Sequence, residues 1–339
     1  MNEDKKKILV LGATGAMGQY LVPELLALGY AVVGVTLDDI TSDNPALRYV
    51  KGNAKADGFL EEILKNGYDG VVDFMTYYTA EFEKIYKLFL DNTKHYIFLS
   101  SCRVFADCPP ITEKSPRLLE ASEDKEFLAT EDYALYKAKE EDMLRKSGYS
   151  NWSIVRPATT YSKGRFQLVT LEAETLIYRM RAGKTVVLPK EAMHCQATHS
   201  WGGDVAKMIA KLMFNEKAYK EDFNVATAEH HSWEEIAGFY NEIHPFKYIA
   251  VPKEDYLDII GPGLDWVKYQ LIYARLFQRI TDNTKILECT GMKQADLMPL
   301  QEGLRMEYEA SADMNWERFA ETDINQRMDA YLERIQFDE

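Results

Sequence analysis

Tyr133 and Lys137 form the residue pair whose types and spacing best suit proton-transfer chemistry. They stand at the two ends of the segment YALYK (133–137), and on a helix residues i and i+4 share one face. A cation close to a phenol favours the phenolate, so the tyrosine can exchange protons near neutral pH instead of near its usual pKa of about 10. Y-x-x-x-K alone is common and usually marks a solvated helix face, so the pair gains weight only from other features.

A hydroxyl that could work with this pair lies upstream. Ser101, in the segment SSCRVF (100–105), directly follows an apolar run and stands 32 residues before Tyr133. The neighbouring thiol of Cys102 is a weaker candidate nucleophile, because no histidine partner for it is visible in the sequence. A serine at a strand end followed by Y-x-x-x-K is more specific than either feature alone.

The segment LVLGATGAMGQYL supplies a third feature, a G-x-x-G-x-x-G pattern at Gly12, Gly15 and Gly18. Such a turn brings backbone N–H groups and a helix N-terminus close to a pyrophosphate. Here the pattern follows a predicted strand and opens a predicted helix. It therefore predicts a dinucleotide site, the alternative being a tight turn that binds nothing.

Asp38 stands 20 residues after Gly18, about where an acidic residue binds the ribose hydroxyls of such a dinucleotide. Alternatively, Asp38 and Asp39 solvate a loop. No arginine stands near this strand end to receive a 2′-phosphate, which favours NAD over NADP.

The elements that must position these residues alternate between strand and helix. Apolar runs at 8–11, 31–37, 70–75, 95–101 and 152–157 are separated by helical patterns, which is typical of parallel βαβ units. After Pro157 the rhythm changes. Helices are expected at 172–182, 203–214, 233–243, 266–280 and 315–335, with short strands at 185–189 and 222–227 and a loop-rich middle around Pro252 and Pro262.

We therefore predict an α/β chain with a Rossmann-like, doubly wound parallel sheet and a smaller α/β C-terminal substrate domain. Residues 1–165 would form the NAD(P)-binding domain, which regains strands from about 198–230. Residues 166–339 would form mainly the substrate-binding domain.

Composition excludes several other classes. The formal charge of −14, from 40 Lys+Arg against 54 Asp+Glu, argues against a nucleic-acid partner. The apolar stretch 8–37 is interrupted by glycines and Pro23, so it predicts buried strands and a helix and not a membrane span or a signal peptide. Four cysteines without C-x-x-C spacing suit a cytoplasmic protein. His194, Cys195 and His199 have no i, i+4 histidine pair, so no metal is expected.

Taken together, the motifs resemble those of the extended short-chain dehydrogenases/reductases, the NAD-dependent epimerase/dehydratase family. The resemblance covers roughly residues 7–230 through GATGAMG, the GN of KGNAKADGFLEEIL, HYIFLSSCRVFAD, YALYK, IVRPATTY and THSWGGDVAKMI. It implies that Ser101 hydrogen-bonds the reacting substrate oxygen, that Tyr133 is the general acid/base, and that Lys137 holds the nicotinamide ribose and tunes the tyrosine.

The resemblance also assigns the remaining ligand contacts. Asn53 and Ala54 match the pair beside adenine, and Pro157 borders the nicotinamide. The cofactor set it implies is Gly12, Thr14, Gly15, Ala16, Met17, Gly18, Thr36, Asp38, Asn53, Ala54, Phe74, Tyr133, Lys137 and Pro157. The substrate set is Ser101, Arg103, Thr159 and Arg165.

Departures from the family pattern refine these expectations. Without gaps, the family's ribose-binding aspartate falls on Thr36 and not on Asp38. Cys102 and Arg103 stand where dehydratases and decarboxylases carry an acidic residue, which favours epimerisation or simple redox over elimination. Gln196 is followed by Ala197 where nucleotide-sugar enzymes have an arginine, and Thr159 or Thr160 replaces their asparagine. Arg165 is a candidate replacement for the missing arginine, although an arginine in such a loop is more commonly exposed to solvent without a ligand.

The expected protein is thus a cytoplasmic NAD(P)-dependent oxidoreductase or isomerase, an epimerase or reductase of a sugar or sugar nucleotide. The family favours a homodimer formed through the Y-x-x-x-K helix and the helix at 79–92, where Phe82, Ile85, Leu88 and Phe89 are apolar, although these residues could equally face the sheet. The alternative is a non-catalytic dinucleotide-binding or RNA-associated member of the same fold.

Overall fold

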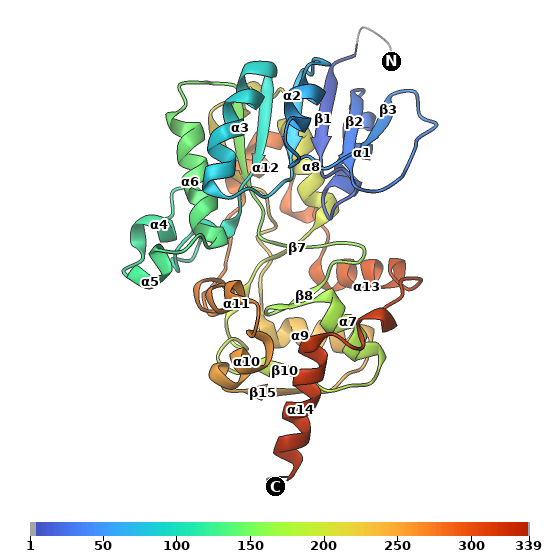
Figure 1. Cartoon of the computed structure of the whole chain (residues 1–339), viewed down its shortest axis with the longest axis vertical. Coiled ribbons are helices and arrows are strands. Elements are labelled where there is room, and N and C mark those ends of the chain that lie inside the picture. The colour runs from blue at the N-terminus through green and yellow to red at the C-terminus, as the bar shows by residue number, and fades with distance from the viewer. Residues whose placement is uncertain (1–4, 338–339) are drawn as a thin grey trace.

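A parallel seven-stranded sheet organises the upper half of the molecule (Figure 1). The computed structural model describes residues 5–337, and its strand order is β3-β2-β1-β4-β5-β6-β13 with every neighbouring pair parallel. The strands are β1 (Lys7–Leu11), β2 (Ala31–Thr36), β3 (Leu47–Lys51), β4 (Gly70–Asp73), β5 (His95–Leu99), β6 (Trp152–Arg156) and β13 (Glu221–Asn224).

Helices cover both faces of this sheet, because successive strand residues point to opposite sides. From β1, Ile8 and Val10 face one layer of helices, α1 (Gly18–Ala27), α8 (Gly202–Leu212) and α12 (Thr284–Thr290). Leu9 and Leu11 face the other layer, α2 (Phe59–Leu64), α3 (Thr79–Asn92) and α6 (Tyr133–Lys146). The predicted Rossmann-like, doubly wound α/β fold is confirmed.

The strand order reverses between β1 and β4, which marks the crevice where doubly wound sheets bind ligands at the carboxyl ends of their strands. Beyond β5 the chain forms η1 (Cys102–Val104), α4 (Leu118–Ala121) and α5 (Lys125–Leu128) before α6 begins.

The lower half of the molecule (Figure 1) has a separate core, whose buried side chains include Trp233, Tyr240 and Tyr256. Its two-stranded sheets pair β10 with β15, β11 with β14 and β8 with β9, and β12 pairs with β7. The elements after β6 are β7 (Thr159–Tyr161), β8 (Gln167–Leu168), β9 (Leu171–Glu172), α7 (Ala173–Arg181), β10 (Val186–Pro189), β11 (Gln196–Ala197), β12 (His199–Trp201), η2 (Glu216–Ala218), β14 (His231–Ser232), α9 (Trp233–Ile243), β15 (Tyr248–Val251), α10 (Lys253–Ile260), α11 (Asp265–Gln270), the π-helix η3 (Leu271–Arg275), η4 (Gln294–Asp296), α13 (Leu300–Ala310), η5 (Glu317–Phe319) and α14 (Asp323–Phe337).

Several boundaries differ from those predicted. The edge strand β3 was not expected, because only part of it is buried and its hydrophobic pattern is weak. The helix expected at 266–280 ends at Arg275 in a π-turn, and the helix expected at 315–335 begins at Asp323. The expected loop-rich middle contains α10, whose apolar face packs into the lower core.

The helix α3 bears on the predicted homodimer. Phe82 and Phe89 are fully buried against the sheet, and Ile85 and Leu88 pack partly against the same core. These apolar side chains stabilise the subunit itself, so the homodimer stays a prediction without their support. Among residues 5–337, none of the helices is both long and apolar enough to cross a lipid bilayer.

A candidate dinucleotide and substrate cavity

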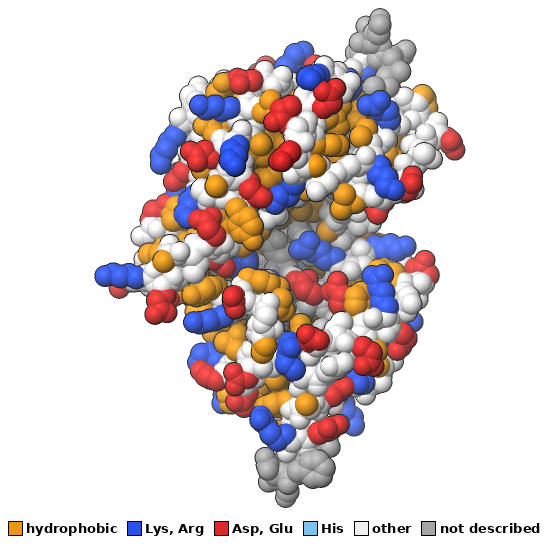
Figure 2. Space-filling view, viewed as in Figure 1, with side chains coloured by type: hydrophobic (Ala, Val, Ile, Leu, Met, Phe, Trp, Pro, Cys, Tyr) orange, Lys and Arg blue, Asp and Glu red, His pale blue; other side chains and the backbone are white. Residues whose placement is uncertain are grey.

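A cavity of about 880 Å³ lies between the carboxyl ends of the sheet strands and the lower half of the molecule. This volume falls in the range of cofactor and small-molecule sites. Figure 2 shows the hollow between the two halves, with basic and acidic side chains around it. Its walls include the glycine turn, the ends of β5 and β6, the start of α6 and the segment 265–281.

The glycine turn is shaped for a close approach of backbone to a ligand. Gly12 has φ +79°, and a Cβ on Gly18 would lie 2.2 Å from the Gly12 carbonyl oxygen, so neither position accepts a side chain without rearrangement. Gly12, Gly15, Ala16, Met17 and Gly18 all line the cavity. The first turn of α1 carries no acidic residue, so its N-terminus remains attractive to a pyrophosphate. These residues fit a dinucleotide.

The end of β2 holds the predicted adenosine contacts. The hydroxyls of Thr14 and Thr36 lie 2.7 Å apart, and Thr36 Oγ1 accepts a hydrogen bond from the Asp38 backbone N–H at 3.0 Å. Asp38 is exposed, and Asp39 forms an ion pair with Lys51 at 3.1 Å. Thr14, Thr36, Asp38, Asn53 and Ala54 lie outside the residues that line the main cavity. Their role in cofactor binding stays a prediction.

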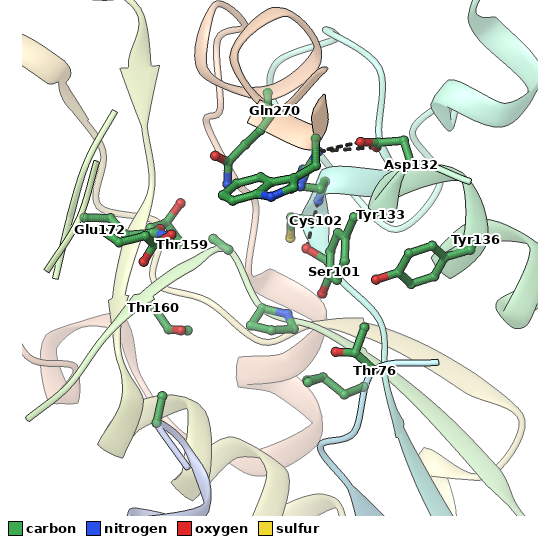
Figure 3. Close-up of a pocket in the computed structure, with 18 of the residues that line it drawn as sticks. Thr76, Ser101, Cys102, Asp132, Tyr133, Tyr136, Thr159, Thr160, Glu172 and Gln270 are labelled. Carbon is green, nitrogen blue, oxygen red and sulfur yellow. Dashed lines mark hydrogen bonds and ion pairs between the residues drawn. The ribbon is translucent and has the colours of Figure 1, made fainter. Parts of the chain in front are cut away.

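Ser101 and Tyr133 come together on one cavity wall (Figure 3). Ser101 follows β5 and caps η1, where its Oγ accepts the Arg103 backbone N–H at 3.1 Å. Tyr133 is the first residue of α6, directly after the N-cap Asp132. Tyr136 also lines this wall, and its ring centroid lies 5.4 Å from that of Tyr133.

The ends of β5, β6 and α6 are tied together by one buried carboxylate. Glu141 accepts two hydrogen bonds from Arg156, at 2.6 and 2.8 Å, and one from Ser100 Oγ at 2.5 Å. Because burial alone would raise its pKa, these partners are what hold the Glu141 pKa below its ordinary value. This contact fixes the strand end that carries Ser101 against the helix that carries Tyr133.

Lys137 lies behind the cavity wall and not on it. Its side chain is fully buried, and its Nζ lies 3.0 Å from Glu140 Oε2 and 4.6 Å from the centre of the Phe98 ring. Burial raises the Glu140 pKa to about 7 against the opposing effect of Lys137. Burial likewise raises the Asp73 pKa to about 6, although Tyr96 donates to that carboxylate at 2.9 Å.

The other predicted contacts are distributed around the opening. Phe74, Pro157, Arg103, Thr159 and Arg165 all line the cavity. Arg103 forms an ion pair with Asp132 at 3.3 Å, and its guanidinium carbon lies 5.2 Å from the centre of the Tyr133 ring. The cation that lies against the face of Tyr133 is therefore Arg103.

The sequence patterns gave no prediction for the far wall of the cavity. Gln167, Glu172, Gln270, Arg275 and Arg279 line it, and most of these residues come from the α11–η3 segment and the loop after it. Two arginines at i, i+4 inside the apolar run LIYARLFQRI were the signal that could have found it.

The Cys102 thiol and a metal site were weaker candidates in the sequence. The Cys102 thiol is buried and donates to the Arg156 carbonyl at 3.2 Å, and burial raises its pKa to about 12, so it does not serve as a thiolate nucleophile. Within the described part of the chain, no group of three His, Cys, Asp or Glu side chains could hold a metal ion.

Comparisons with known proteins point in one direction. The sequence profile of the NAD dependent epimerase/dehydratase family matches residues 8–226. No curated protein matches the chain. Among solved structures, the epimerase Mth375 from Methanothermobacter thermautotrophicus has a TM-score of 0.70 at 15% identity, covering 94% of this chain and 95% of that one.

Two further structures contain the dinucleotide. The UDP-glucose 4-epimerase of Thermus thermophilus, a complex with NAD, has a TM-score of 0.67 at 16% identity and covers 91% of this chain and 100% of its own. The enzyme WbmH of Bordetella bronchiseptica, in complex with NAD+, has a TM-score of 0.68 at 15% identity and covers 91% and 99%. At these identities the structures show a shared fold.

Proposed function

The chain belongs to the NAD dependent epimerase/dehydratase family and is a nicotinamide-dinucleotide-dependent enzyme, and we propose that it oxidises or reduces a hydroxyl-bearing carbon of a sugar or sugar nucleotide. The single observation that carries this proposal is that Ser101 and Tyr133 line the same cavity as the glycine turn. It supports the proposal because a tyrosine able to exchange a proton and a serine hydroxyl would then adjoin the dinucleotide.

The cofactor, when bound, accepts and returns hydride at its nicotinamide ring. The chain itself moves the proton. Tyr133 Oη takes the proton of the substrate hydroxyl during oxidation and returns it during reduction, and Ser101 Oγ hydrogen-bonds and orients the same oxygen. The glycine turn and the N-terminus of α1 hold the pyrophosphate.

The same wall supports epimerisation or simple redox over elimination. Elimination next to a carbonyl needs a carboxylate that removes a carbon-bound proton. Of the carboxylates that line the cavity, Asp132 directly precedes Tyr133; it accepts the Ala134 backbone N–H at 2.9 Å as the N-cap of α6 and forms an ion pair with Arg103. Asp132 is thus engaged in holding the start of α6 and Arg103.

NAD is the dinucleotide we propose over NADP, because Asp38 and Asp39 stand exposed at the end of β2 and a 2′-phosphate would meet their charges. Lys51 offsets only Asp39. We also propose that the protein works as a homodimer in the cytoplasm without a nucleic-acid partner, in line with its charge of −14.

The test is turnover by the full chain with NAD and NADP against a panel of sugar nucleotides, free sugars and sugar acids. A reductase converts the cofactor stoichiometrically, which changes nicotinamide absorbance. An epimerase interconverts two sugars with no net change in cofactor. Binding of dinucleotide without either outcome would favour the non-catalytic alternative, and retention on RNA at physiological salt would favour the RNA-associated one.

A further inference from the structure

Two arginines in the far wall of the cavity are buried without a carboxylate partner. Arg275 and Arg279 are only 6% and 8% exposed, and within residues 5–337 neither has an Asp or Glu oxygen within the 4.0 Å of an ion pair. Burial, together with repulsion from Arg103, lowers the Arg275 pKa to about 9 and the Arg279 pKa to about 10. An unpaired buried charge is unfavourable for the fold.

The chain treats its other buried arginines differently. Arg156, 1% exposed, pairs with Glu141 and Asp222 at 2.6 and 2.7 Å. Arg179, fully buried, pairs with Asp329 at 2.7 Å. Arg275 and Arg279, which line the cavity, thus differ from these two arginines in lacking an acidic partner. A ligand in the cavity can supply that partner.

Their hydrogen bonds separate the roles of the two arginines. Arg279 donates to the backbone carbonyls of Phe105, Tyr273, Ala274 and, at 3.5 Å, Cys102, and so ties the two cavity walls together. Arg275 donates to the Val169 carbonyl at 2.8 Å, to Thr159 Oγ1 at 3.2 Å and to Gln167 Oε1 at 3.3 Å. A guanidinium has five N–H donors, so Arg275 keeps donors for a ligand.

A second side chain on the same wall also lacks its partner. Gln270 lines the cavity and is 6% exposed, and its buried Oε1 has no hydrogen-bond partner among the described residues. Figure 3 shows its amide at the cavity. Gln270 ends α11 and Arg275 ends the π-helix that follows, and π-turns are often found at functional sites.

The position of Arg275 indicates whether its anionic partner belongs to the substrate or to the cofactor. Arg275 contacts Thr159, and Pro157, two residues earlier, accepts the backbone N–H of Cys102, the neighbour of Ser101, at 3.0 Å. Arg275 thus lines the same cavity as Ser101 and contacts the chain segment that borders Ser101, whereas the cofactor pyrophosphate is expected at the glycine turn. Gln196, where nucleotide-sugar relatives would be followed by a cation, is bonded internally to His230 and Gln278.

On the premise of the proposed function, we propose that the substrate is a small sugar derivative that carries its own anion, a carboxylate or a phosphate monoester, beside the reacting carbon. Arg275 and Thr159 bind the anion, and Gln270 accepts a substrate hydroxyl. A nucleotide is not needed for recognition.

The test measures binding to the full chain loaded with NAD by titration calorimetry. The probes are glucuronate, glucose 6-phosphate, glucose and UDP-glucose. We expect one of the two small acids to bind roughly 10- to 100-fold more tightly than glucose, the gain of a charge-assisted, bidentate contact. Preference for glucuronate or for glucose 6-phosphate decides between carboxylate and phosphate.

Variants assign that preference to Arg275. Arg275→Met should bring the acid to the affinity of glucose, and Arg275→Lys should retain part of the preference, because the charge stays but the planar fork is lost. Arg181→Met is the matched control, since Arg181 is an exposed arginine at the end of α7 in the same half. Thr159→Asp places a carboxylate beside Arg275 and should raise the Tm of the unliganded protein while it abolishes acid binding.

The proposal is overturned if neither acid binds better than glucose, or if UDP-glucose binds most tightly and independently of Arg275. Two variant results would also overturn it: an equal loss of acid binding in Arg181→Met and Arg275→Met, or a lower Tm in Thr159→Asp. Failure of this proposal can be distinguished from failure of the proposed function. Acid binding that depends on Arg275 without any hydride transfer would leave the subsite intact and remove the sugar redox activity. Equal turnover of glucose and its acids would do the reverse.

Discussion

Two buried charge clusters, one behind a wall of the cavity and one lining it, differ in whether acidic or basic groups are in excess. Behind Tyr133, one ammonium, Lys137, faces the two carboxyls of Asp73 and Glu140. Across the cavity, Arg275 and Arg279 donate to neutral oxygens only. In the first cluster the ammonium has an ion-pair partner in Glu140, and burial raises the pKa of both carboxyls, which favours their neutral forms. In the second cluster neither guanidinium has an ion-pair partner, and the proposed substrate anion would supply one.

The difference teaches how little net charge says about a site. A chain with a formal charge of −14 repels anions at long range, yet salt screens that field over a distance of about 8–10 Å. Inside the cavity the nearest charged groups have the larger effect on a ligand, and on the far wall two of them are the guanidinium groups of Arg275 and Arg279, with Glu172 as the carboxylate on that wall. An acidic surface and an anion-binding site coexist in one small protein for this reason.

The largest effect is expected at the phenol between the two clusters. Tyr133→Phe removes the proton path and should reduce turnover about 10²–10⁴-fold, with dinucleotide affinity nearly unchanged. The measurement is hydride transfer and cofactor titration side by side. Tyr136→Phe is the matched control, since its ring also lines the wall. A dead Tyr136→Phe beside an active Tyr133→Phe would move the catalytic role one turn along α6.

The next largest effect should come from removing the one cation of the acidic cluster. Lys137→Met leaves Asp73 and Glu140 buried without a counter-charge and should lower the free energy of unfolding at neutral pH by about 3–5 kcal/mol. Denaturant titration measures this loss. The loss should shrink at pH 5, where both carboxyls are protonated. A loss of equal size at both pH values would mean that Lys137 acts only through packing.

Local motifs explain which parts of this comparison the sequence could predict. Gly12, Gly18, Ser101 and Tyr133 sit in short patterns whose chemistry depends on neighbours in sequence, and the structure places all four at one cavity. The doubly wound sheet, with its strands β1, β2, β4, β5 and β6, followed from apolar runs and their spacing. Its edge strand β3 did not, because an edge strand is only half buried and carries a weak pattern.

Both charge clusters depend on contacts that the sequence does not reveal. Glu140 is the i+3 neighbour of Lys137 on α6, but Asp73 ends β4, so only the packing of α6 on the sheet brings Asp73 to Lys137. The Y-x-x-x-K spacing placed Lys137 on the face of Tyr133, yet the long side chain extends into the core. Arg275 ends η3 and Thr159 begins β7, 116 residues earlier, so only the packing of the lower half brings them into contact.

A smaller effect should come from the pH dependence that the acidic cluster gives to the free energy of unfolding. The Glu140 pKa is about 7 in the folded protein against an ordinary value of 4.5, so between these values the folded state binds more protons than the unfolded chain. Its contribution therefore makes the free energy of unfolding fall as pH rises through this window, by up to about 1.4 kcal/mol per pH unit. Asp73, with a pKa of about 6, acts in the same direction at slightly lower pH.

Glu140→Gln should flatten that slope, because one cation then faces one carboxyl, Asp73. Urea titrations between pH 5 and 8 measure it. The exposed carboxylate of Glu61, on α2, is the matched control, and Glu61→Gln should leave the slope unchanged. An unaltered slope in Glu140→Gln would assign the pH dependence to other groups.

The smallest effect is expected where a carboxylate is exposed and not buried. Asp38 stands in solvent at the end of β2, with its backbone N–H held by Thr36 at 3.0 Å. Repulsion between Asp38 and a 2′-phosphate acts through water, so it is weak at each site. Asp38→Asn should therefore improve NADP affinity relative to NAD by only about 2- to 10-fold, and added salt should narrow the difference in affinity between the two dinucleotides.

Asp43→Asn, an exposed change in the same loop, is the control for general surface charge. Competition titrations of both dinucleotides, followed by intrinsic fluorescence, give the ratio. If the unsubstituted chain already binds NADP more tightly, or if Asp43→Asn shifts the ratio as much as Asp38→Asn, then the strand-end carboxylate does not select the cofactor and Lys51, whose ion pair with Asp39 lies at the same edge, becomes the residue to test.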